Sequence, residues 1–227
     1  MKTKNNNTIE NSALCFTSLY PEELDFLQDK KTQLEYSKNE QIFKQGAFAT
    51  HVIFINDGLV KISIQTGFDK QMNIRLASTG EFIAFSSVFG DNNYPYSATA
   101  LRNSKICMID KEALKNLLEE NTDFAMSITS RNCRNETRLF EIIRNVSYKQ
   151  MPGKLASALV YLSSPEFEKE NIFTLLTRQD LAEFASVSTE SAIKILKDFE
   201  QEGIIELKGK DILINNKEKL IEISERG

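Results

Sequence analysis

The chain has 227 residues, 41% of them hydrophobic and 26% charged, and its formal net charge is −4. This is an ordinary globular composition, and the length allows one large or two ordinary domains. Apolar runs stay well short of about 18 residues, and the N-terminal string MKTKNNNTIEN lacks the apolar stretch of a secretory signal. We therefore expect neither a membrane span nor export, and a cytoplasmic location.

The cysteines and the single histidine restrict the chemistry available to the chain. Cys15, Cys107 and Cys133 are odd in number and far apart, which indicates reduced thiols rather than disulfides or metal ligands. His51 is the only histidine, which leaves little for a metal site or a Ser–His–Asp triad. We expect a protein that is not an enzyme.

The N-terminal half reads as a β domain behind a polar tail. Residues 1–11 are predicted to be disordered, and residues 14–31 to hold a short helix that begins near Pro21. Short β-rich runs then alternate with glycine-containing turns, which is typical of a β-sandwich or barrel. The predicted strands are Gln41–Phe43, His51–Ile55, Leu59–Gln65, Gln71–Leu76, Tyr96–Ala100 and Lys105–Ile109.

Two helices are predicted to follow the β domain. The first covers Lys111–Glu120 and the second Thr122–Asn145, a length of about six turns. Apolar residues recur along the second helix at mixed spacings, with polar residues between them. From the residues alone, such a stripe fits either the core of one chain or a seam between two chains.

The most informative stretch is Leu176–Asn215. Thr177 is a good N-cap with Asp180 three residues later, as in a capping box. Ser188 caps a second helix, which Gly203 ends. The apolar residues of that second helix recur at spacings of three and four and define one face. They are Ala192, Ile195, Leu196 and Phe199.

The order of elements in this stretch indicates a winged helix-turn-helix. A hairpin of Ile204–Leu207 and Asp211–Ile214 would form the wing, with lysines at its Lys208-Gly209-Lys210 turn. In a helix-turn-helix, the start of the second helix meets base edges in the major groove. The alternative is two core helices and an ordinary hairpin. Charge does not support DNA binding independently, because residues 150–227 carry 10 lysines and arginines against 14 aspartates and glutamates.

Several strings together resemble the CRP/FNR family of bacterial transcription regulators. QIFKQGAFATHVIFINDGLVKISIQ and ASTGEFIAFSSVF are similar to the family's cyclic-nucleotide-binding β-roll, including Gly46, Gly58 and Gly80. TRQDLAEFA and STESAIKILKDFEQEGII are similar to its helix-turn-helix. The resemblance implies an α+β fold with four parts: a disordered tail (1–11), a β-roll sensor domain (12–121), a long dimerisation helix (122–146) and a winged helix-turn-helix domain (147–227).

The resemblance also implies partners and contact residues. The partners are double-stranded DNA, a second copy of the chain and RNA polymerase. Glu190 and Lys194 match the base-contacting positions, and Ile193 is placed to touch a thymine methyl. The full predicted DNA-contact set is Thr177, Arg178, Gln179, Ser188, Thr189, Glu190, Ser191, Ile193, Lys194, Lys197, Lys208 and Lys210. The predicted residues of the dimer helix are Phe124, Ile128, Asn135, Leu139 and Ile142.

The sensor pocket departs from the family pattern. Cyclic-AMP receptors carry a Gly-Glu pair and an Arg-Ser pair there, whereas this chain has Ala84-Phe85 and Tyr96-Ser97. Loss of the arginine would leave a cyclic phosphate buried without a cation, which argues against cyclic AMP. Cys15 stands alone where the oxygen-sensing branch has a cysteine group, which argues against an iron–sulfur cluster. The predicted pocket residues are Phe82, Ala84, Phe85, Ser86, Tyr94, Tyr96 and Ser97.

This aromatic region could admit an apolar or planar ligand such as haem, or it could be a filled core, and the effector stays unknown. The sequence predicts a dimeric, sequence-specific DNA-binding regulator with an effector other than cyclic AMP or none. The alternative is a small-molecule-binding module whose C-terminal domain contacts protein rather than DNA.

Overall fold

The computed structural model describes Phe16, residues 18–90 and residues 92–227. The predictions for residues 1–11 and for Cys15 lie outside this part of the chain. The chain folds as two compact units, one of Met1–Gln65 with Arg75–Glu136 and the other of Thr66–Ile74 with Thr137–Gly227.

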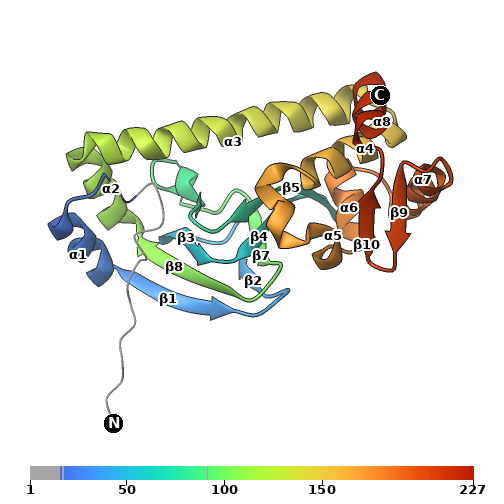
Figure 1. Ribbon diagram of the computed structural model, residues 1–227. Helices are drawn as coiled ribbons and strands as arrows, with labels where there is room; N and C mark the ends of the chain where they lie inside the picture. Colours follow the sequence, from blue (N-terminus) through green and yellow to red (C-terminus); the bar gives the residue numbers. More distant parts are fainter. Residues whose placement is uncertain (1–15, 17, 91) are drawn as a thin grey trace, which may run out of the picture. The chain divides into compact units, whose positions relative to one another are not determined.

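The first unit is built on two antiparallel sheets (Figure 1), although the end of β4 and the first half of β5, within residues 66–74, are grouped with the second unit. One has the strand order β1-β8-β3-β6 and the other β2-β7-β4-β5. The strands are β1 (Lys31–Tyr36), β2 (Gln41–Phe43), β3 (His51–Asp57), β4 (Leu59–Gly67), β5 (Lys70–Ser78), β6 (Phe82–Ile83), β7 (Ser97–Ala100) and β8 (Ser104–Asp110). All six predicted strands are present to within two residues at either end. The sequence reading missed β1 and the two-residue β6.

Glycines permit two of the tight turns between these strands. Gly58, between β3 and β4, has φ +151°, and a Cβ atom there would collide with the side chain of Ser104. Gly80, before β6, has φ +87°, which lies in the left-handed region. The turn glycines predicted from the sequence therefore have a backbone reason to be glycine.

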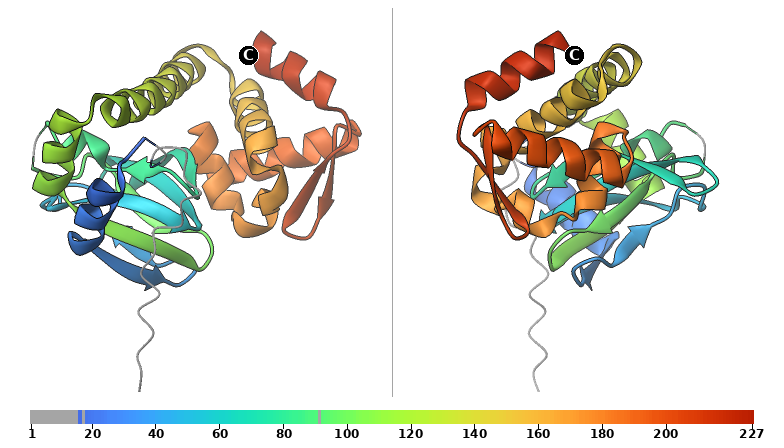
Figure 2. Two further views of the ribbon diagram at one scale, coloured as in Figure 1. Left: turned by 60° about the vertical axis from the view of Figure 1, so that its left-hand side comes forward. Right: turned by 90° about the vertical axis from the view of Figure 1, so that its right-hand side faces the viewer.

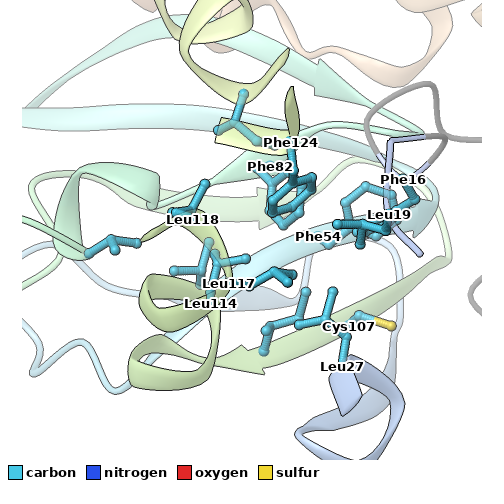
Figure 3. Packing of buried hydrophobic residues seen from close by; sticks show 14 residues of the cluster. Phe16, Leu19, Leu27, Phe54, Phe82, Cys107, Leu114, Leu117, Leu118 and Phe124 are labelled. Carbon is cyan, nitrogen blue, oxygen red and sulfur yellow. The ribbon is translucent and has the colours of Figure 1, made fainter. Parts of the chain in front are cut away.

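Helices complete the first unit and close its core. They are α1 (Pro21–Asp29), the 3₁₀ turn η1 (Phe85–Ser87), α2 (Lys111–Glu120) and the beginning of α3 (Thr122–Tyr148). Figure 3 shows the cluster in which Phe16, Phe54, Phe82 and Phe124 meet. The Phe16 ring lies 4.7 Å from that of Phe54 and 5.7 Å from that of Phe82, both edge-on, an arrangement that adds to the stabilisation from burial.

The predicted dimer residues of α3 differ in their exposure. Phe124 and Ile128 are 0% and 2% exposed within the core of the first unit, and Ile142 is 8% exposed. These three side chains are buried within their own chain and leave little apolar surface for a second chain to cover. Asn135 is half-buried, and of the predicted set only Leu139, 46% exposed, lies open.

A different stripe of α3 faces outward. Met126, Cys133 and Phe140 recur every seven residues, and all three are exposed. Thr129, Glu136 and Ile143 lie three residues further along and are exposed as well. Alternating spacings of three and four are the a and d positions of a heptad repeat. We call these six residues the exposed α3 stripe.

The second unit contains α4 (Met151–Leu162), η2 (Pro165–Glu170), α5 (Ile172–Leu175), α6 (Arg178–Ala185), α7 (Thr189–Gln201), β9 (Ile205–Lys208), β10 (Asp211–Ile214) and α8 (Lys217–Arg226). The two helices and the hairpin of the predicted winged helix-turn-helix are present. Helix α8, which the sequence reading missed, packs against α4 (Figure 2). Gly153 of α4 permits this approach, since a Cβ atom there would lie 2.7 Å from the backbone of Gly227.

Candidate nucleic-acid interface

A reciprocal cap fixes the start of α6. The Thr177 hydroxyl accepts a hydrogen bond from the backbone N–H of Asp180 at 3.0 Å. The Asp180 carboxylate accepts in return from the backbone N–H of Thr177 at 2.8 Å. This is the predicted capping box with aspartate at its third position. The cap engages the hydroxyl of Thr177, a member of the predicted DNA-contact set.

The turn between α6 and α7 depends on a strained serine. Ser186 ends α6 with φ +53° and ψ +45°, in the left-handed region. Residues other than glycine adopt this conformation at a cost, because their Cβ crowds the backbone. The backbone N–H of Val187 then donates to the Ala182 carbonyl at 3.0 Å and closes the turn. The strain is local and sets the direction in which α7 leaves.

Helix α7 has one buried face and one exposed face. Its cap is Ser188, whose hydroxyl accepts from the backbone N–H of Ser191 at 3.1 Å. The predicted apolar stripe is confirmed, because Ala192, Ile195, Leu196 and Phe199 are all at most 7% exposed. The opposite arc carries five predicted contact residues, of which Thr189 is half-buried and the other four are exposed. We call them the exposed α7 arc: Thr189, Glu190, Ile193, Lys194 and Lys197. Their helical spacing places them within about 140° of one another.

Glu190 has an environment that favours its charged form. Its carboxylate accepts a hydrogen bond from its own backbone N–H and another from Ser188, and these lower its pKa. The start of a helix also stabilises negative charge. Glu190 therefore presents a carboxylate acceptor at neutral pH, which is the group that can bind the amino group of cytosine.

The β9–β10 hairpin lies beside the end of α7 (Figure 1). Its turn residue Gly209 has φ +63°, and Lys208 and Lys210 on either side are exposed. Lys208 Nζ lies 3.3 Å from a carboxylate oxygen of Glu206, an exposed pair of small energetic value. The hairpin therefore carries two lysines on its turn, as expected for a wing.

Arg178 and Gln179, both predicted contact residues, also have partners within the chain. Arg178 Nη2 donates to the carbonyl of Gly209 at 2.9 Å, so the arginine connects α6 with the wing. Gln179 Nε2 donates to a carboxylate oxygen of Glu183 one turn later, at 2.9 Å. Gln179 remains exposed, whereas Arg178 is half-buried.

The predicted sensor-pocket residues mostly pack against one another. Phe82, Ala84 and Tyr94 are buried, and the Tyr94 ring stacks on Phe43 at 4.1 Å. Phe85 packs against the same core, whereas Ser86 is exposed. These contacts are those of a filled interior.

Polar groups of the pocket are also engaged. The Tyr96 hydroxyl accepts a hydrogen bond from the Ala84 backbone N–H at 2.6 Å, and burial raises the pKa of this phenol. Ala84 has φ +60°, a conformation for which glycine is better suited. Ser97 Oγ accepts from the Gln45 backbone N–H at 3.0 Å. Arg75 faces the same region, but its guanidinium binds the Glu81 carboxylate at 2.7 Å.

The described part of the chain offers neither a metal-ligand cluster nor a helix that could span a membrane. In it, no three histidine, cysteine, aspartate or glutamate side chains gather as metal ligands would. None of its helices combines the length and apolar character that crossing a bilayer requires.

Two families match this chain. Residues 33–121 match the cyclic nucleotide-binding domain, and residues 153–223 match the Crp-like helix-turn-helix domain. The chain belongs to the CRP/FNR family of transcription regulators. It is therefore a transcription regulator with a helix-turn-helix DNA-binding domain, and its family is one of regulators rather than enzymes.

Curated relatives align over most of their length. The anaerobic regulatory protein of Bacillus subtilis is 26% identical over 196 residues, which are 83% of this chain and 82% of that protein. The CRP-like cAMP-activated global transcriptional regulator of Mycobacterium tuberculosis is 21% identical over 209 residues, 90% of this chain and 93% of that protein. The fumarate and nitrate reduction regulatory protein of Vibrio cholerae is 25% identical over 210 residues, 89% and 82% of the two chains.

Solved structures share the fold of this CRP/FNR regulator. FixK2 from Bradyrhizobium japonicum superposes with a TM-score of 0.74 at 14% identity, covering 85% of this chain and 96% of that one. The c-di-GMP-responsive regulator CLP of Xanthomonas campestris gives a TM-score of 0.75 at 17% identity, covering 85% and 98%. At these identities the likeness supports the architecture alone.

Sequence reasoning missed some features that bear on the site. The exposed α3 stripe repeats every seven residues from Met126 to Phe140, a signal present in the sequence but hidden by the stronger apolar pattern of the buried face. The hydrogen bond between Arg178 and Gly209 joins residues 31 positions apart, so no pattern of neighbouring residues predicts it.

The strain at Ser186 yields a stability prediction. Ser186→Gly should raise the free energy of unfolding by roughly 0.5–1 kcal/mol, because glycine adopts the left-handed conformation without crowding. Thermal unfolding of the full chain measures the change. Ser163→Gly is the matched control, since Ser163 ends α4 with φ −97° and should gain nothing. Equal effects of the two changes would contradict the strain argument.

Proposed function

We propose that this regulator binds palindromic DNA sites as a homodimer, and that its effector is not cyclic AMP or that it has none. The observation that carries the proposal is the exposed α7 arc, which combines an acceptor, an apolar side chain and two cations on a capped helix beside a lysine-bearing wing. A helix inserted in the major groove needs this combination to read bases.

Within the arc, Glu190 and Lys194 are the proposed base contacts. They lie four residues apart and project from the first half of α7. Glu190 would accept from cytosine N4, and Lys194 would donate to guanine O6 or N7. Lysine lacks the planar fork of arginine, so discrimination at its base pair should be modest. Ile193, 39% exposed, is proposed to contact a thymine methyl.

Phosphate contacts would hold the helix in register without specifying sequence. Lys197 on α7 and Lys208 and Lys210 on the wing are exposed cations that are suitable for this role. Ser188, Thr189, Ser191 and Gln179 supply further polar groups near the two helix starts. Thr177 is also exposed and stays in the proposed phosphate-contact set, although its hydroxyl already accepts a hydrogen bond in the cap.

The exposed α3 stripe is the proposed dimer seam. Met126, Phe140 and Ile143 are 60–64% exposed, and side chains of this size are seldom left open along one helical line without a partner. A second copy with its helix in parallel register would cover the a and d positions of the repeat. The two-fold axis would then present two α7 helices to two half-sites about one turn apart.

The contacts in the sensor region support an effector other than cyclic AMP, or none. Phe85 and Tyr96 stand where the family pattern has an acid and a cation. Tyr96 instead offers a buried neutral phenol bound to Ala84, and Arg75 is neutralised by Glu81. A cyclic phosphate would meet no uncommitted cation from these residues.

The proposal includes the cytoplasm as the place of action and RNA polymerase as a further partner, as expected of a regulator of this type. A mobility-shift assay with a palindromic duplex at two salt concentrations tests DNA binding. Affinity should fall steeply with salt, because phosphate contacts release counterions. Absence of DNA binding under all conditions would favour a C-terminal domain that contacts protein.

Lys194 and Lys208 should have separable roles. Lys194→Ala should cost on the order of 1–3 kcal/mol at one base pair of each half-site and relax the preference there. Lys208→Ala should weaken all sequences about equally and reduce the salt slope by about one. Selection from random duplexes measures both effects. If Lys194→Ala keeps the base preference of the wild type, or if Lys208→Ala changes it, the base-contact and phosphate-contact roles are wrongly assigned.

The seam assignment predicts a matched pair of outcomes. Phe140→Glu should weaken the dimer on the order of 100-fold, because burying the new charge costs roughly 3 kcal/mol. Phe68→Glu, at a side chain that is 95% exposed, is the control and should leave the dimer unchanged. Sedimentation measures both. If Phe140→Glu stays fully dimeric, the seam lies elsewhere.

Cyclic AMP should not bind. Isothermal calorimetry of the full chain with cyclic AMP should show no heat of binding at micromolar concentrations, because no cation of the pocket set is available to the phosphate. The same preparation should bind duplex DNA, which confirms that it is folded. A micromolar affinity for cyclic AMP would show that the pocket argument is wrong.

A further inference from the structure

We propose that Arg178 positions the wing of the DNA-binding domain and does not itself contact phosphate. This inference rests on the proposed DNA-binding function and reassigns one residue within it. Its basis is the hydrogen bond from Arg178 Nη2 to the Gly209 carbonyl at 2.9 Å.

The wing is too small to hold a fixed orientation alone. Its strands β9 and β10 have four residues each and pair only with one another. An isolated two-stranded hairpin is marginally stable in water. Contacts from outside the hairpin must therefore fix the direction of its turn.

The base of the wing is anchored at two points. The Ile204 carbonyl accepts from the backbone N–H groups of Asn215 and Asn216 at 2.9 and 3.0 Å. Near the end of α7, a Glu200 carboxylate oxygen accepts from the backbone N–H of Leu207 at 3.0 Å. These bonds hold the strands where they leave the helix, but the turn extends beyond them.

Arg178 supplies the anchor at the turn. Its backbone is the first residue of α6, directly after the capping box of Thr177 and Asp180, so the side chain starts from a fixed point. The bond ends on Gly209, between Lys208 and Lys210. The orientation of both lysines therefore depends on this bond.

The rest of the guanidinium also faces the protein. Arg178 Nη1 is buried and has no hydrogen-bond partner among the described residues. Asp211 and Glu200 lie close enough to favour its charge, against the desolvation that lowers its pKa. An arginine that presented its fork to phosphate would have both Nη atoms open to solvent.

A double-mutant cycle separates positioning from direct contact. If Arg178 acts through the wing, Arg178→Ala should reduce the salt slope of DNA binding by up to about two, and should have no further effect when Lys208 and Lys210 are already alanine. Arg178→Lys should behave like Arg178→Ala, because a lysine lacks the fork and length of arginine. Lys194→Ala is the control, and its loss of DNA-binding free energy should add in full to the loss caused by Lys208→Ala and Lys210→Ala.

A direct phosphate contact gives a different pattern. Arg178→Ala would then lower the slope by about one in both backgrounds, and Arg178→Lys would restore most of the loss. Either result would overturn the proposal.

A measurement without DNA keeps the inference independent of the proposed function. In the free full-length protein, Arg178→Ala should speed amide hydrogen exchange of residues 205–214 and leave α6 and α7 unchanged. Unchanged exchange in the hairpin, or faster exchange throughout the second unit, would contradict a positioning role. If the wild type binds no DNA but the hairpin exchange responds as expected, the proposed function fails and the positioning role stands.

Discussion

The packing of α7 against α6 is the interaction on which the proposed DNA recognition by this regulator depends. Ala192, Ile195 and Leu196 are buried on one face of the helix. Because the helix repeats every 3.6 residues, burial of this face determines which side chains point outward. The exposed α7 arc is thus a consequence of the core. The caps at Thr177 and Ser188 and the left-handed Ser186 then set where each helix begins and how the two are joined.

Helix α3 likewise has one buried face and one exposed face, which have different roles. Its inner face carries Phe124 and Ile128 into the core of the first unit, and its outer face carries Met126 and Phe140. Large apolar side chains are costly to leave uncovered on both faces of one helix, and the protein's own core covers only the inner face. A helix with two such faces can join the fold of a sensor domain to the assembly of two chains.

The sequence was sufficient to predict those elements whose structure is determined by residues close together in the chain. The capping box at Thr177, the apolar stripe of α7 and the predicted strands could be recognised from residues close together in the chain. The buried and exposed faces of α3 could not be told apart in the sequence, because Ile128 and Phe140 are both apolar and only burial shows which face the core occupies. Strand β1 was missed because its residues KTQLEY follow a helix directly and four of the six are polar. The bond from Arg178 to Gly209 depends on tertiary approach, which no local pattern encodes.

The central claim is that two α7 helices enter successive major grooves of one palindromic duplex. The most direct test is affinity cleavage from an iron–EDTA group tethered at Thr189→Cys, in a chain with Cys15 and Cys133 replaced by serine. We expect two symmetric clusters of cuts separated by one helical turn, about 10 base pairs. A single cluster, or cuts no more localised than those of free iron–EDTA, would contradict the account.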